Sequence, residues 1–105
     1  MSWVYLVLAG VFEIGWPLGL KLAQGPTHRF KGVVLAVVSM AVSGGLLWLA
    51  QRQISLGTAY AVWTGIGAAG TFFMGVWLFG DPTNLGRYLG VILIIGGVVV
   101  LKLAH

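Results

Sequence analysis

Glu13 is the residue whose type and position most directly suggest chemistry. Apart from it, the segment from Trp3 to Leu20 carries no charge. A carboxylate at membrane depth is costly and is by default a functional-site hypothesis. No Lys or Arg inside an apolar segment offers a structural ion-pair partner, since Lys21 lies two helical turns away. A carboxyl group there can hold a proton or bind an organic cation, but not both well, so Glu13 predicts proton/cation exchange. The alternative is an acid that only hydrogen-bonds a neighbouring helix.

Aromatic and small residues at helical spacing would complete a cation site. Trp16 lies three residues after Glu13 on the same helical face, and Gly10, three residues before it, removes bulk beside the acid. Tyr60 and Trp63 repeat this spacing in another apolar segment. Rings with hydrogen-bond donors around a carboxylate suit a flat or delocalised cation. The alternative for each ring is the aromatic belt at the membrane interface, although Trp63 lies well inside its segment.

Other residues near the candidate site leave alternatives open. Ser43 is the remaining small donor at mid-depth, but such hydroxyls often bond only their own backbone. Gly65 and Gly67 interrupt a predicted helix, which predicts either a hinge for transport or tight helix packing. Pro17 should kink the first helix and free a backbone carbonyl near the site.

These residues lie in apolar segments that the composition places in a membrane. The 105-residue chain is 59% hydrophobic and only 8% charged, against about 25% in soluble domains, so its charges cannot coat a soluble surface. Spans of the length that crosses a bilayer are predicted at about 3–22, 32–51, 57–79 and 86–103. The predicted fold class is therefore all-α integral membrane, one domain of four transmembrane helices over residues 1–105, multi-pass in the inner (plasma) membrane.

Several function classes are excluded by residue type. There is no cysteine, hence no disulfide, thiolate metal site or cysteine nucleophile. The basic residues are spread singly and form no stripe for nucleic acid. His28 lies in a predicted loop and His105 is the last residue, and neither has a nucleophile or ligand partner. We predict no enzyme activity, no metal and no cofactor.

Charge and glycine placement bear on assembly. The basic side chains divide unevenly between the two membrane faces, with Lys21, Arg29, Lys31 and Arg87 on one and Arg52 and Lys102 on the other. This bias is small under the positive-inside rule, so the chain could insert in either orientation.

Four helices cannot enclose a wide polar pathway alone. Gly90 and Gly97, two turns apart, would let helix backbones approach closely, which predicts at least a dimer or else packing within the monomer.

Three segments resemble the small multidrug resistance family, and the resemblance covers the chain from Trp3 to Lys102. Residues 9–16 are similar to the signature around the family's essential glutamate, 57–67 to its third-helix motif and 90–98 to its fourth-helix dimer motif. Trp16 and residues 63–67 resemble the guanidinium-exporter subtype.

The resemblance implies an antiparallel, dual-topology homodimer that exports guanidinium in exchange for protons by alternating access. It implies that Glu13 binds the proton or the cation, and that Trp16 and Ser43 support the carboxylate by hydrogen bonds. It also implies that Tyr60 and Trp63 line the cavity, while Gly65 and Gly67 bend the third helix. The implied partners are a small organic cation, protons, the lipid bilayer and a second copy of the chain.

The sequence departs from the family pattern in three places. Pro17 replaces a usual small residue, the first loop is one residue longer, and Gly44-Gly45 stands where bulkier side chains are common. In the family this last position borders an opening toward lipid, so substituted guanidines, guanylurea or biguanides are predicted as further substrates. The alternatives are a promiscuous quaternary ammonium exporter and a non-transporting membrane subunit. A pore is disfavoured because channels favour rings of charge or carbonyls along a continuous path, whereas this chain has one acid inside the membrane.

Overall fold

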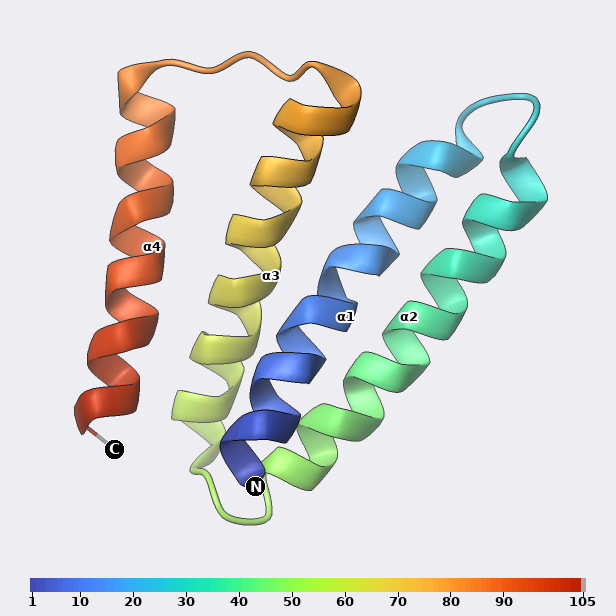
Figure 1. Cartoon of the computed structure of the whole chain (residues 1–105). Coiled ribbons are helices and arrows are strands. Elements are labelled where there is room, and N and C mark those ends of the chain that lie inside the picture. Colours follow the sequence, from blue (N-terminus) through green and yellow to red (C-terminus); the bar gives the residue numbers. More distant parts are fainter. Residues whose placement is uncertain (105) are drawn as a thin grey trace.

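The computed structural model describes residues 1–104 as four long helices in two hairpins (Figure 1). The helices are α1 (Ser2–Ala23), α2 (Arg29–Ala50), α3 (Leu56–Phe79) and α4 (Leu85–Ala104). At about 1.5 Å per residue each one covers the roughly 30 Å of a bilayer's hydrocarbon core, and each is apolar enough to do so. Their bounds agree with the predicted spans to within about one helical turn. His105, for which no function was predicted, lies outside the described residues.

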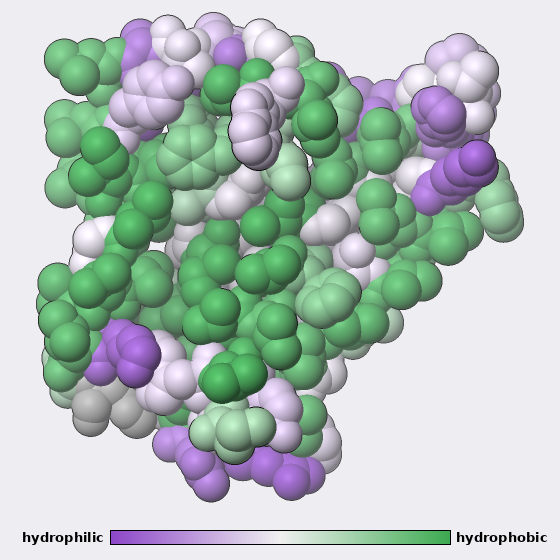
Figure 2. Space-filling view, viewed as in Figure 1, coloured by the Kyte–Doolittle hydropathy of each residue, from purple (hydrophilic) through white to green (hydrophobic). Residues whose placement is uncertain are grey.

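The helices form a single layer rather than a closed bundle. α1 packs against α2 and α3, and α4 packs against α3 alone, so the order across the layer is α2, α1, α3, α4 (Figure 1). The molecule measures 44 × 34 × 17 Å, and its shortest dimension is little more than one helix diameter of about 10–12 Å. Figure 2 shows an apolar band with hydrophilic residues gathered toward the two ends of the molecule. This distribution suits a chain that crosses a membrane.

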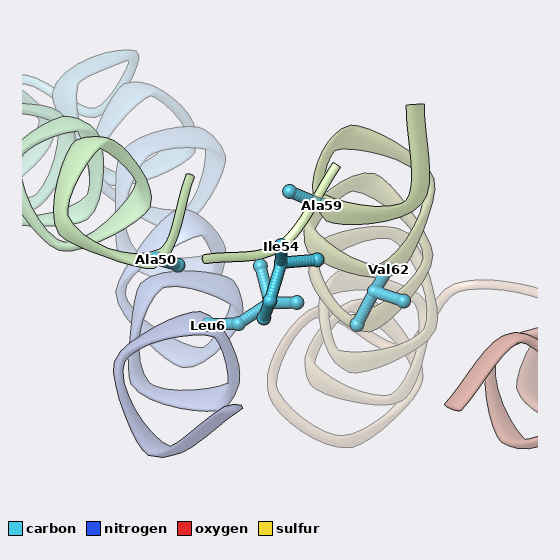
Figure 3. Close-up of a cluster of buried hydrophobic side chains, with 5 residues drawn as sticks. All are labelled: Leu6, Ala50, Ile54, Ala59 and Val62. Carbon is cyan, nitrogen blue, oxygen red and sulfur yellow. The ribbon is translucent and has the colours of Figure 1, made fainter. Parts of the chain in front are cut away.

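A small hydrophobic core closes the end of the molecule where α1 begins. Its buried members, shown in Figure 3, are Leu6, Ala50, Ile54, Ala59 and Val62. They come from α1, the α2–α3 turn and the adjoining ends of α2 and α3. A hydrogen bond from the Ser2 hydroxyl to the Gln53 side-chain oxygen (2.8 Å) joins the same elements. The core fixes α3 against α1 at this end of the layer.

Glycine allows α1 and α2 to pack almost backbone to backbone. A methyl group added at Gly19 would meet the Gly32 carbonyl oxygen and the backbone of Ala36. One added at Gly15 would meet the Ser39 hydroxyl. This is the close approach by which small residues drive helix association in lipid. The α1–α2 hairpin is thus held by backbone proximity rather than by large side chains.

Two predicted irregularities do not break the helices. α1 continues from Ser2 to Ala23 through Pro17, and α3 continues from Leu56 to Phe79 through Gly65 and Gly67. Both glycines serve as contact points for neighbouring side chains, as the packing alternative expects. Bending of α3 during transport stays a prediction.

Candidate cation-binding site

Glu13 lies midway along α1 and faces α3. Its side chain is half-buried, with Trp16 as its hydrogen-bonding neighbour. The carboxyl oxygen Oε2 is buried and has no hydrogen-bond partner within residues 1–104. Buried polar atoms in proteins are nearly always partnered, so an orphaned acceptor at this depth is a place where a ligand would gain hydrogen bonds.

Gly67 makes the space that the Glu13 side chain occupies. A Cβ atom built on Gly67 would collide with Cγ of Glu13. One helical turn away, a Cβ on Gly10 would lie 2.7 Å from Cβ of Ile66. The close α1–α3 approach therefore needs glycine on both sides of the interface. The prediction that Gly10 removes bulk beside the acid stays a prediction, while the contact of Gly67 with Glu13 and that of Gly10 with Ile66 had no signal in residue spacing.

A hydrogen-bonded chain ties the three helices together next to Glu13. The Trp63 indole Nε1–H donates to the Ser43 hydroxyl oxygen (2.7 Å), and that hydroxyl donates to the Ala9 carbonyl oxygen (2.6 Å). Ser43 is fully buried. Ala9 lies one turn before Glu13, so the chain crosses the layer beside the carboxylate.

This network differs from the expected role of Ser43 as a direct support for the carboxylate. Here the Ser43 proton is committed to the Ala9 carbonyl, and Ser43 acts on the site by fixing the Trp63 ring. The Ala9 acceptor was missed because every residue carries a backbone carbonyl, so residue type does not indicate which one accepts a side-chain hydrogen bond.

Two of the predicted aromatic residues lie together on α3. Tyr60 is 55% exposed, and the centroid of its ring lies 5.5 Å from that of Trp63 at an interplanar angle of 51°. Tilted rings at this distance make favourable contacts. The pair thus presents a partly open aromatic surface near the hydrogen-bonded chain.

Trp16, the neighbour of Glu13 on α1, also reaches the α2 side of the layer. With residues of α1 and α2 it lines an apolar groove of about 400 Å³, whose other residues are Leu20, Val33, Ala36, Val37, Met40 and Ala41. The structure therefore distributes the predicted rings on two sides of α1 and does not gather them into one closed cavity within one chain.

The remaining predicted glycines have different surroundings. A Cβ on Gly65 would lie 2.6 Å from Val98, so in this conformation Gly65 is a contact between α3 and α4. Gly44, Gly90 and Gly97 have nothing within 4 Å of an added Cβ. The alternative that Gly90 and Gly97 pack within the monomer is therefore wrong. The open space at Gly44 agrees with the expectation of room beside α2.

Within residues 1–104 no group of three or more His, Cys, Asp or Glu side chains could hold a metal ion. Within one chain the candidate site is a single carboxylate with one unpartnered oxygen, with the Trp16 indole beside it on α1 and the Tyr60 and Trp63 rings on the adjoining α3. Such a set can bind an organic cation by charge, hydrogen bonds and ring contacts, and it can exchange that cation for a proton.

A lone carboxylate among membrane-spanning helices is the kind of site that a small cation transporter uses. The model for the Small Multidrug Resistance protein family matches residues 1–94. The chain is also similar to proteins named guanidinium exporter. It is 45% identical over 104 residues to the one from Yersinia pseudotuberculosis serotype I and 44% identical to the one from Proteus vulgaris, with 99% of each chain covered. It is 42% identical to the one from Salmonella typhimurium, which it covers to 98%.

The chain belongs to the small multidrug resistance family. Its place in a family of exporters makes it a transporter and not an enzyme. With four apolar spans it is a multi-pass protein of the inner membrane.

Proposed function

We propose that this protein exports guanidinium in exchange for protons, with Glu13 as the shared binding group. The observation that carries the proposal is the buried, unpartnered Oε2 of Glu13 at mid-membrane depth. The guanidinium exporters that are 42–45% identical along nearly their whole length support the choice of cation.

Guanidinium fits the chemistry of this site. It is planar, permanently charged and fork-shaped, so it can donate two parallel hydrogen bonds to one carboxylate. Trp16, Tyr60 and Trp63 offer ring faces to a delocalised cation. A proton on Glu13 removes both the negative charge and one acceptor, so proton and guanidinium binding exclude each other. Exchange then needs no separate coupling residue.

The working unit that we propose is an antiparallel homodimer with alternating access. One chain is a single layer of helices, and α4 buries only Val91 within it. A second layer facing the first would bring its own Glu13 to the site, while the open glycine positions Gly90 and Gly97 would let the two α4 helices approach. The weak charge bias between loops suits insertion in both orientations.

Substituted guanidinyl cations, guanylurea and biguanides are proposed as further substrates. The support is the open space at Gly44 and Gly45 beside the buried Ser43. Gly44→Phe should impair transport of phenylguanidine or a biguanide while sparing guanidinium. Equal loss for both cations would contradict a role of this opening in selectivity.

The decisive experiment measures solid-supported-membrane currents from proteoliposomes holding the purified protein. Guanidinium, guanylurea and a tetra-substituted ammonium are each added to wild type, Glu13→Gln and Arg52→Gln. Arg52→Gln is the matched control, because it neutralises an exposed charge at the opposite end of α2 from the α1–α2 turn, away from Glu13. We expect guanidinyl currents in wild type and in Arg52→Gln, and none in Glu13→Gln.

Other outcomes would replace the proposal. Equal currents with the tetra-substituted ammonium would favour a promiscuous multidrug exporter. Guanidinyl currents that persist in Glu13→Gln would remove the carboxylate from the mechanism. No current with any cation, from protein shown to be folded, would favour a non-transporting subunit.

A further inference from the structure

A pocket with two charged side chains in an otherwise mostly apolar lining lies away from the cation site, at the end of the layer where α1 and α3 finish. It has a volume of about 190 Å³ and its lining includes Pro17, Lys21, Thr71, Phe79 and Asp81. α1 and α3 run in the same direction and end on the same side (Figure 1). The pocket therefore extends from within the apolar band to the level of the membrane surface.

The pocket carries two opposite charges that do not neutralise each other. Lys21 Nζ lies 5.9 Å from the centroid of the Phe79 ring, and Asp81 lines the same pocket. Among residues 1–104, however, neither Lys21 nor Asp81 belongs to an ion pair. The Asp81 carboxylate thus offers hydrogen-bond acceptors and the Lys21 ammonium offers donors, at separate places in one pocket.

The backbone fixes Asp81 in a position that favours a cation partner. Gly80 adopts a left-handed conformation (φ 65°), and the Asp81 N–H donates to the Gly75 carbonyl oxygen (3.1 Å). The Asp81 carboxylate lies so close to Gly75 that an added Cβ there would collide with Oδ2. A carboxylate beside a helix C-terminus is repelled by the helix dipole, because that end is already negative. An added positive group near Asp81 would relieve this repulsion.

The geometry points to a binding site for the headgroup of phosphatidylethanolamine. Its phosphate would pair with Lys21, and its primary ammonium would donate hydrogen bonds to Asp81. Leu18 and Met74 provide apolar lining for the first part of the acyl chains. A lone cation would be opposed by Lys21 and a lone anion by Asp81, whereas a zwitterion satisfies both. This site is independent of Glu13 and of the proposed transport activity.

Thermal unfolding of the purified, delipidated protein in detergent tests this site. The five tryptophans give an intrinsic fluorescence signal. Dioleoyl lipids with ethanolamine, choline or glycerol headgroups are added in turn, together with soluble phosphoethanolamine as a separate arm. Choline has no N–H donor and phosphatidylglycerol has no cation. A ligand that binds only the native state raises the unfolding midpoint. We therefore expect the ethanolamine lipid to raise the thermal unfolding midpoint by about 3 °C or more beyond the other lipids.

Variants assign the effect to the two charges. The ethanolamine increment should be lost in Asp81→Asn and in Lys21→Gln, and retained in Arg52→Gln, which removes a charge at the other end. Equal stabilisation of wild type by the ethanolamine and choline lipids would overturn the proposal, and so would an increment that persists in Asp81→Asn. Equal stabilisation by soluble phosphoethanolamine would overturn its lipid part. Guanidinium chloride is added in a further arm. If it raises the unfolding midpoint of wild type but not of Asp81→Asn, the pocket binds the transported cation instead, and the lipid proposal is overturned.

Discussion

Glu13 and Gly67 share one small volume at the α1–α3 contact. We predict that Gly67→Ala displaces the Glu13 side chain, because the new methyl group would occupy the place of its Cγ. Transport should fall about tenfold or more, on the order of 1.4 kcal/mol in the barrier. Liposome currents measure the change. Gly57→Ala on the same helix is the control, because its added methyl group meets nothing. Wild-type currents in Gly67→Ala would mean that the carboxylate tolerates displacement.

Ser43 carries two buried hydrogen bonds that fix the Trp63 ring. Ser43→Ala leaves the Trp63 Nε1–H and the Ala9 carbonyl without this partner, which costs about 1–3 kcal/mol for a buried group. We therefore expect a lower unfolding midpoint and weaker binding of guanidinium. Thermal unfolding and a binding titration measure these effects. Ser55→Ala, at an exposed serine with no side-chain capping bond, is the matched control. Unchanged binding would show that ring placement does not depend on Ser43.

At the scale of helices, the α1–α2 contact depends on the absence of side chains. Gly32 lies against the backbone of Gly19 and Ala23, so Gly32→Ala forces the helices apart and should destabilise the protein by about 1–3 kcal/mol. Gly45→Ala on the same helix has open space and should leave the stability near that of wild type. The fraction folded in increasing denaturant gives the comparison. Equal stability of the two variants would contradict backbone packing as the determinant of the hairpin.

At the scale of the whole molecule, the proposed antiparallel homodimer requires that the chain inserts into the membrane in both orientations. Because the chain has no cysteine, single-cysteine variants report orientation without background. We predict that Thr83→Cys and Gln51→Cys are each labelled by an impermeant thiol reagent from both sides of the membrane, in about equal amounts. Labelling of each variant from one side only, and from opposite sides for the two, would contradict dual topology.

The proposed proton coupling is also a property of the whole assembly. If one carboxylate serves proton and cation alternately, the apparent affinity for guanidinium should fall as the pH is lowered, approaching about tenfold per pH unit and per competing proton in the acid limit. Equilibrium binding to purified protein at a series of pH values measures this slope. An affinity that does not change with pH would separate proton binding from the cation site.

The sequence by itself determined the class of fold and the candidate group of the site. Length and scarcity of charge require membrane spans, since a charged group costs too much inside a bilayer and a soluble surface needs many. The same cost makes Glu13 the first candidate for a functional group, and helical periodicity places Trp16 on its face. These properties are local, so residue type and spacing suffice to read them.

Only the tertiary structure decided which residues meet between helices. The contacts of Gly67 with Glu13 and of Gly65 with Val98, and the bond from Ser43 to the Ala9 carbonyl, depend on the relative rotation and depth of neighbouring helices. In so apolar a chain nearly every helical face is hydrophobic, so periodicity does not indicate which face turns inward. Steric fit between small residues and side chains decides it instead, and that fit exists only once the helices are packed.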